Sequence, residues 1–284
     1  MAIPLASEEE ISGRSLYGDN FSSDQIQEWY DSEVTGYFDL LSNHYKITDE
    51  DNKYNYEYAA LNQFHAIGSL LDRQFDTCLA LGCAAGDDIA PLAPVVQRFI
   101  AIEPAEKWWR GQIGGKPAMY MSPSASGDIG LDSATVDLAT SFGVLHHIPN
   151  VSHVVGEIAR VLKPGGLFVL REPISSMGDW RKARAGLTAN ERGLPIEWFE
   201  SLARTTGFTI LARHACMFGP LSAIAKKLGI SLPFARMPIV KADWLISEAL
   251  RWNARYWRDT FAKKLAPSSV FWILELRIVD QALK

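Results

Sequence analysis

Two adjacent histidines, His146 and His147, follow an apolar run at residues 136–141. A histidine near its unperturbed pKa is a suitable general base at neutral pH and can accept the proton of a hydroxyl group. A carboxylate, Glu172, follows the next apolar run at residues 167–171. In a parallel sheet the carboxyl ends of such strands lie at one edge. The pattern therefore indicates proton-transfer chemistry at that edge.

A glycine-containing turn, Gly82 to Gly86, follows another apolar run at residues 76–81. After a short helical segment, a second apolar run at residues 98–102 ends in Glu103. Glycines let the backbone approach a ligand closely, and a carboxylate at a strand tip can accept hydrogen bonds from both hydroxyls of a ribose. This layout predicts a nucleoside-binding crevice.

Two further motifs identify the type of nucleoside site. They are His-His-Ile-Pro at residues 146–149 and Leu-Lys-Pro-Gly-Gly at residues 162–166. With the glycine turn before them, residues 75–175 resemble the class I S-adenosylmethionine-dependent methyltransferases. The resemblance implies an α/β fold, in which a doubly wound, mostly parallel sheet of seven strands carries an N-terminal helical lid and a C-terminal helical cap. It also implies S-adenosylmethionine as cofactor and S-adenosylhomocysteine as product.

The same resemblance assigns the donor-binding residues. They are Leu81, Gly82, Cys83, Ala84, Gly86, Asp87, Glu103, Pro104, Ser124, Ala125, Ser141 and Phe142. Three positions depart from the family pattern, because Ala80, Ala84 and the pair Ser124-Ala125 stand where an acid, a glycine and an acid are usual. Asp87 or Asp88 is a candidate replacement for the first acid, unless it only caps the helix, and Asp128 for the last. Ala84 also argues against a dinucleotide, whose pyrophosphate requires a closer backbone approach.

In related sugar and small-molecule O-methyltransferases the histidine pair and the acid serve as base and orienting partner. This assigns catalysis to His147, the favoured base, with His146 and Glu172, and requires no metal. The alternative is that the histidines only form the turn. For the acceptor we consider Tyr54, Tyr58, His65 and Trp244, which are equally compatible with core or interface packing.

Periodicity divides the chain into four parts: a lid segment (1–70), the methyltransferase core (71–218), a cap (219–268), and a final strand with the tail (269–284). Further strands are expected near residues 118–121, 208–217 and 270–279, and helices near 21–41, 54–71, 151–162 and 195–206. The cap is expected to contain one long helix over residues 242–261, rich in aromatic residues. Such aromatics pack in a core, line an acceptor pocket or rest on a membrane surface.

Charge is unevenly distributed along the chain. Residues 1–60 contain thirteen acids and three bases, whereas residues 219–268 contain nine bases and three acids. Two solvated faces or the two sides of a homodimer contact explain this, and so does attraction of an anionic acceptor such as a nucleotide sugar or a phosphate-bearing lipid. The net charge of −5 does not indicate the basic surface that nucleic-acid binding requires.

The N-terminus lacks the pattern of a secretory signal, and no apolar run approaches the length of a membrane span. Three cysteines without zinc-ligand spacing suggest reduced thiols and a cytoplasmic location. The predicted function is methylation of a hydroxyl on a sugar-containing or natural-product small molecule. N- or C-methylation and a catalytically silent donor-binding partner protein remain alternatives.

Overall fold

The computed structural model describes residues 4–44, 57–180, 182, 184, 187–188 and 190–277. One predicted acceptor residue, Tyr54, lies outside them. The strands are β1 (Phe75–Leu81), β2 (Val96–Ile102), β3 (Gln112–Ile113), β4 (Lys116–Met121), β5 (Val136–Phe142), β6 (Leu162–Pro173), β7 (Phe208–Phe218) and β8 (Pro267–Leu276). The α-helices are α1 (Glu8–Ser12), α2 (Ser23–His44), α3 (Ala59–His65), α4 (Val151–Val161), α5 (Ile196–Thr205), α6 (Gly219–Lys227), α7 (Met237–Leu250) and α8 (Phe261–Lys264). Short 3₁₀ helices are η1 (Ile67–Leu70), η2 (Ala90–Leu92), η3 (Glu106–Trp108), η4 (Leu145–His147), η5 (Pro233–Ala235) and η6 (Arg251–Asn253).

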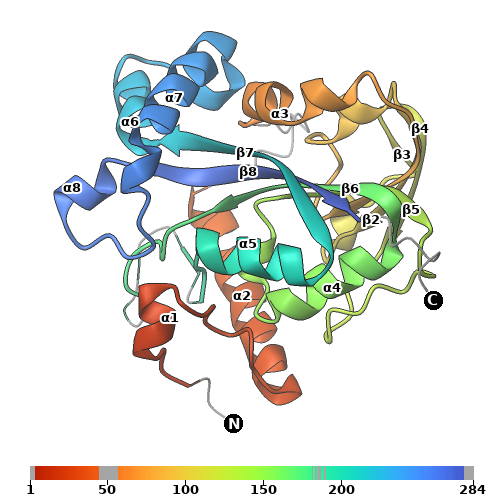
Figure 1. Cartoon of the computed structure of the whole chain (residues 1–284), viewed down its shortest axis with the longest axis horizontal. Helices are drawn as coiled ribbons and strands as arrows, with labels where there is room; N and C mark the ends of the chain where they lie inside the picture. The colour runs from red at the N-terminus through yellow and green to blue at the C-terminus, as the bar shows by residue number, and fades with distance from the viewer. Residues whose placement is uncertain are drawn as a thin grey trace.

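All eight strands form one sheet in the order β3-β4-β2-β1-β5-β6-β8-β7 (Figure 1). The five strands from β4 to β6 pair in parallel, and β8 and β7 continue the sheet antiparallel. The seven predicted strands are therefore present. An eighth, β3, pairs antiparallel with β4 through a tight turn that the sequence analysis did not identify.

The central strands are buried on both faces, as expected for a parallel sheet covered by helices. On β1, Cys78 and Ala80 face the core shared with α3, η5 and α7, while Leu79 and Leu81 face the core shared with α4 and α5. Because successive side chains of a strand point to opposite faces, one apolar run supplies both cores. In the sheet, β1 lies between β2 and β5, and the strand order reverses direction at this point. Open α/β sheets bind ligands at the carboxyl ends of the strands beside such a reversal.

The Leu-Lys-Pro-Gly-Gly motif lies inside β6 rather than before it. Helix α4 ends at Val161, and the pairing of β6 with β5 shifts register between Leu162 and Leu167. Gly165 has a φ of +80°, a conformation that glycine adopts without strain. The motif therefore forms a bulge that starts the strand, and its role is structural.

The cap, residues 219–268, is inserted between β7 and β8 and lies on the left of Figure 1. The predicted long helix over 242–261 is wrong, since α7 ends at Leu250. Beyond it, Tyr256 is buried in an aromatic cluster with Tyr17, Trp29 and Trp180. Packing of Tyr256 against the N-terminal segment overrides the helical periodicity. Among the residues that the structure describes, no helix is long and apolar enough to cross a membrane.

Candidate functional site

The turn after β1 brings backbone to the edge of a cavity. Gly82 and Gly86 have φ of +57° and +87°, and Ala84, in place of the expected middle glycine, has φ of +47°. A Cβ on Gly86 would lie 2.6 Å from the Ile113 side chain, and one on Gly82 would lie 2.7 Å from Val144. These glycines are therefore required by the fold of the turn.

Glu103, at the end of β2, faces the same turn. Its two carboxylate oxygens accept hydrogen bonds from the backbone N–H groups of Ala84 and Ala105, each at 3.0 Å. The residue is buried, and burial raises the pKa of its carboxyl despite these bonds. Each oxygen retains a second lone pair. The carboxylate thus holds the turn in place and can still accept hydrogen bonds from a ligand.

The turn and Glu103 line a cavity of about 420 Å³ at the carboxyl ends of β1, β2 and β5. Nine of the predicted residues line it: Tyr58, Gly82, Cys83, Ala84, Asp87, Glu103, Phe142, His146 and His147. Its other walls include Trp108, Arg171, Glu191 and Met217, none of which the sequence analysis singled out. The glycine turn and the histidine pair therefore line the same cavity.

Asp88 also lines this cavity, two residues after the glycine turn. Its Oδ1 is buried and has no hydrogen-bond partner in the structure. Burial raises the pKa of Asp88 to about 7, although the positive charge of Arg171 opposes the shift. A buried carboxylate without a partner is costly, and a cation in the cavity would compensate it. Of the two candidate replacement acids, Asp87 is exposed, whereas Asp88 has a buried carboxylate oxygen without a partner.

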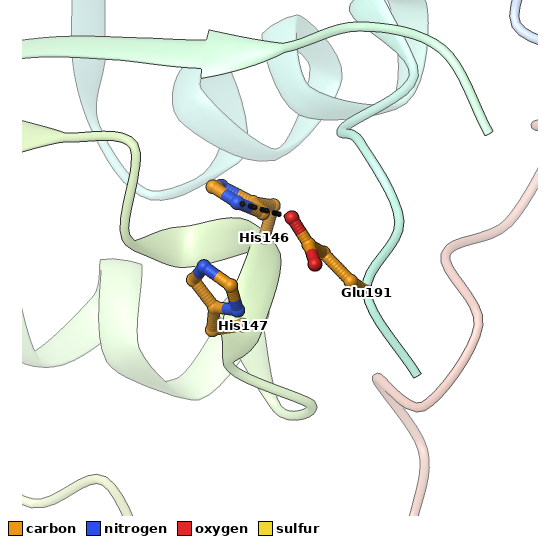
Figure 2. Close-up of side chains that lie close together, drawn as sticks. All are labelled: His146, His147 and Glu191. Carbon is orange, nitrogen blue, oxygen red and sulfur yellow. Dashed lines mark ion pairs between the residues drawn. The ribbon is translucent and has the colours of Figure 1, made fainter. Parts of the chain in front are cut away.

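His146 is buried between two carboxylates. Its Nδ1 lies 2.8 Å from Glu172, and its Nε2 lies 3.5 Å from Glu191 (Figure 2). Burial alone would lower the pKa of His146, but the two carboxylates outweigh burial and raise it to about 9. Burial opposes the ionisation of Glu191 too, yet pairing with His146 lowers the pKa of Glu191 to about 2. At neutral pH this ring is therefore an imidazolium.

Glu172 is fully buried and does not line the cavity. Its Oε1 accepts hydrogen bonds from the backbone N–H groups of Val144 and Leu145, each at 2.9 Å, and its Oε2 faces His146. The sequence analysis paired this acid with the histidine dyad as a whole. In the structure, Glu172 contacts only His146 of the pair and also holds the backbone of the turn that carries both histidines.

His147 has a different carboxylate partner, Glu33 of α2. Nδ1 of His147 lies 3.1 Å from Oε2 of Glu33, and that oxygen also accepts a hydrogen bond from the Thr188 hydroxyl at 2.7 Å. The His147 side chain is 36% exposed, against 9% for Glu33. Since 114 residues separate the two, the sequence pattern gave no signal for this pair. With Nδ1–H donating to Glu33, Nε2 of the neutral ring carries a lone pair.

The two imidazole rings are neighbours, with centroids 4.0 Å apart (Figure 2). His146, His147 and Glu191 each offer an atom within 4.8 Å of those of the other two. Two imidazoles and a carboxylate are ligand types that Zn²⁺ and Fe²⁺ accept. Among the described residues this set could hold a divalent ion, and the absence of a metal from the reaction stays a prediction.

Eight further predicted residues are not among those that line the cavity. These are Leu81, Gly86, Pro104, Ser124, Ala125, Ser141, His65 and Trp244. Ser124 is exposed, and its hydroxyl lies 2.7 Å from that of Ser126. Burial lowers the pKa of His65 to about 3, and its ring stacks on Phe271.

Trp244 packs edge-on against Phe64 of α3. Like His65, it serves packing between the lid segment, the cap and the sheet. The interpretation of these two residues as packing residues, which the sequence left open, agrees with these contacts.

The described lid segment reaches the cavity through Tyr58. The Arg171 guanidinium lies 4.1 Å from the centre of the Tyr58 ring and donates a hydrogen bond to Asn62 at 3.2 Å. A cation held over an aromatic ring in a buried setting is attracted by the ring face. This contact connects α3 to the tip of β6 beside the cavity.

Comparisons with known proteins agree with this arrangement. Residues 79–170 match the family model described as a methyltransferase domain. The matched segment contains β1, the glycine turn, Glu103, the histidine pair and most of β6. This segment is a class I S-adenosylmethionine-dependent methyltransferase domain. Membership implies S-adenosylmethionine as the cofactor.

Two curated proteins are similar to parts of the chain. An uncharacterized 37.1 kDa protein in transposon TN4556 of Streptomyces fradiae is 30% identical over 114 residues, which are 38% of this chain and 32% of that protein. A probable S-adenosylmethionine-dependent methyltransferase of Mycolicibacterium smegmatis is 28% identical over 95 residues, 34% of this chain and 37% of that protein. The chain thus spans about a third of the length of the curated relatives it matches.

Among solved structures, a putative S-adenosylmethionine-dependent methyltransferase from Listeria monocytogenes superposes with a TM-score of 0.53 and 14% identity. The alignment covers 78% of this chain and 99% of that one. At this identity the similarity establishes the fold.

The cavity fits the donor that the family implies. Glu103 presents carboxylate oxygens of the kind that bind a ribose diol. The buried Oδ1 of Asp88 has no hydrogen-bond partner, and the ammonium group of the donor's amino acid could donate a hydrogen bond to it. Trp108 adds an aromatic wall beside them.

Proposed function

We propose that the protein transfers the methyl group of S-adenosylmethionine to a hydroxyl of a sugar-containing or natural-product small molecule. One observation carries the proposal: two histidines, each held by its own carboxylate, line the same cavity as the donor loop. This arrangement supplies a place for the donor and a proton acceptor within one cavity. Both are required when a hydroxyl is the nucleophile.

On the donor side, Glu103 would hold the ribose and Asp88 the ammonium group. Backbone from Gly82 to Ala85 forms the wall between them. When bound, S-adenosylmethionine supplies an electrophilic methyl group on a positively charged sulfur. The positive charges of this donor suit a cavity in which four acids, Asp87, Asp88, Glu103 and Glu191, outnumber the two cations, Arg171 and His146.

On the acceptor side, His147 is the proposed base and Glu33 its positioning residue. The Nδ1–H···carboxylate contact fixes the ring and leaves Nε2 to accept the hydroxyl proton. The carboxylate then stabilises the imidazolium that forms. His146 cannot take this role at neutral pH, because its raised pKa keeps it protonated between Glu172 and Glu191. It serves instead as a fixed donor and positive charge beside the cavity.

Two alternatives remain as candidates. N- or C-methylation needs no strong base, and a silent binding protein needs no acceptor. If either alternative is correct, replacement of His147 should leave methyl transfer or donor binding unchanged. An O-methyltransferase should instead lose turnover, because it depends on the imidazole.

The test uses the full chain with isotopically labelled S-adenosylmethionine and a panel of hydroxylated acceptors. We expect labelled product, and we expect His147→Ala to lower kcat by about 10²–10⁴-fold with donor affinity nearly unchanged. The matched control is His153→Ala, which removes an exposed histidine paired with Asp128. Turnover by His147→Ala at the wild-type rate would exclude the proposed base. Donor binding without transfer to any acceptor class would favour the silent binder.

A further inference from the structure

The cap carries most of the large apolar side chains exposed on the described surface. Of ten such side chains, six belong to these 50 residues of the 284-residue chain, so they are concentrated there. They are Ile224, Leu228, Trp244, Leu245, Trp252 and Phe261. Phe261, Leu228 and Trp252 are 78%, 76% and 72% exposed, which is unusual for side chains of this size. Such a concentration marks an interaction surface rather than scattered exposure.

The charged residues of the cap leave a basic surface. Its three acids already have partners within the chain. Asp243 is buried and accepts hydrogen bonds from two backbone N–H groups of β7, Glu248 accepts one from a third, and Asp259 pairs with Lys263. The exposed bases are Lys226, Lys227, Arg236, Lys241, Arg251, Arg255 and Lys264. Of these, Lys226 pairs with Glu57 and Arg251 pairs with Glu248. Positive charge and apolar side chains are therefore interspersed on the same segment.

Helix α7 shows how the two kinds of side chain are combined. Val240, Asp243 and Ser247 form its buried face. Lys241 and Leu245 lie on the opposite face at a spacing of four residues, and Trp252 follows in η6 with 72% of its surface exposed. Figure 1 shows α6, α7 and α8 along one side of the molecule, opposite β3 and β4. The exposed cap residues thus belong to elements on one side of the molecule in this view.

We propose that this side of the cap docks on the surface of an anionic lipid bilayer. Tryptophan and phenylalanine beside lysine and arginine are the combination that binds the interface between headgroups and acyl chains. The basic residues would be attracted to anionic headgroups, while the apolar side chains enter the boundary beneath them. The cap begins and ends beside Met217 and Ser269, which line the cavity. Docking would therefore bring the cavity close to the bilayer. The docking proposal itself does not depend on the proposed methyl transfer.

Flotation with lipid vesicles tests the proposal on the full chain. We expect binding to phosphatidylcholine vesicles that contain about 30% phosphatidylglycerol, little binding to phosphatidylcholine alone, and weaker binding when salt rises from about 0.1 M to about 0.5 M. The double variant Trp252→Ser/Phe261→Ser should lower the partition coefficient by at least about tenfold. Lys227→Glu/Lys264→Glu should do the same for the anionic vesicles.

Matched controls replace similar residues outside the cap: Leu71→Ser/Met119→Ser for the apolar pair and Arg73→Glu for the charge. All variants should retain the wild-type thermal transition and donor affinity, which separates docking from folding and from the proposed function. The proposal is overturned if anionic vesicles do not bind the protein, or if the controls lose binding equally. Sedimentation showing a dimer that the cap variants dissociate, without vesicle binding, would assign the surface to a second copy.

Discussion

Replacement of Glu33 by glutamine should slow methyl transfer without weakening donor binding. Glutamine keeps the shape of the side chain and an oxygen that can accept from His147 and Thr188, but it removes the negative charge. Glu33 is buried and His147 is partly exposed, so the charge acts through a contact that solvent screens only in part. The perturbation therefore affects mainly the imidazolium that forms when the hydroxyl loses its proton.

The size of the effect follows from the contact at 3.1 Å between Glu33 and Nδ1 of His147. A hydrogen bond to a charged group contributes about 1.5–3 kcal/mol, against about 0.5–1.5 kcal/mol for a neutral one. The difference of about 1–2 kcal/mol corresponds to a decrease in kcat of about 5- to 30-fold. The loss should be confined to kcat, because Glu33 does not line the cavity.

The assay is a double-mutant cycle on steady-state methyl transfer, with donor affinity measured by calorimetry. If Glu33 acts only through His147, then Glu33→Gln should have no further effect in the His147→Ala background. Asp128→Asn is the matched control, since Asp128 does not line the cavity and the change removes the charge from the exposed His153–Asp128 pair at 2.7 Å. Wild-type kcat in Glu33→Gln would refute the reasoning, and so would an equal loss in both backgrounds, because a purely structural role would not require the imidazole.

Three further predictions concern the donor side and the metal. Burial raises the pKa of Asp88 from 3.8 to about 7, so its favourable contribution to folding is present below about pH 4 and is lost as pH rises through 7. Asp88→Asn should therefore stabilise the ligand-free protein at pH 8 by up to about 4 kcal/mol in denaturant titrations, while weakening donor binding. Glu103→Gln should weaken the donor Kd by about 1–2 kcal/mol in calorimetry, and an unchanged Kd would remove Glu103 from the ribose site. Exhaustive chelation should leave kcat unchanged; recovery of lost activity by Zn²⁺ or Fe²⁺ would instead make His146, His147 and Glu191 metal ligands.

The sequence predicted the sheet, and it placed the glycine turn beside Glu103, because both depend on local patterns. The apolar runs, the glycine turn and the residue that ends each strand specify which side chains reach the carboxyl edge. The errors arose where packing between distant segments decides. Helix α7 ends at Leu250 because Tyr256 joins the N-terminal aromatic cluster. Gly86 is small because Ile113 of the unexpected β3 lies against it.

The acceptor side was predictable only in part for the same reason. His146 and His147 stand out in the sequence, but Glu33 and Glu191 are separated from them by long stretches and lie in no recognisable pattern. Trp108 was missed although an aromatic residue shortly after Glu103 is a usable signal.

The groups that hold the histidine turn come largely from outside the matched segment, 79–170. Trp29 donates a hydrogen bond to the His147 carbonyl at 2.8 Å, and the buried Arg192 guanidinium donates to the carbonyls of His146 and Ile148, each at 2.9 Å. Glu33 and Glu191 supply the charges that face the imidazoles. Most of the residues proposed to bind the donor therefore lie in the matched segment, whereas the charged partners of the proposed base come from the flanking segments. Relatives that share only the matched segment are expected to use the same donor. The acceptor of such a relative cannot be assigned to this chain.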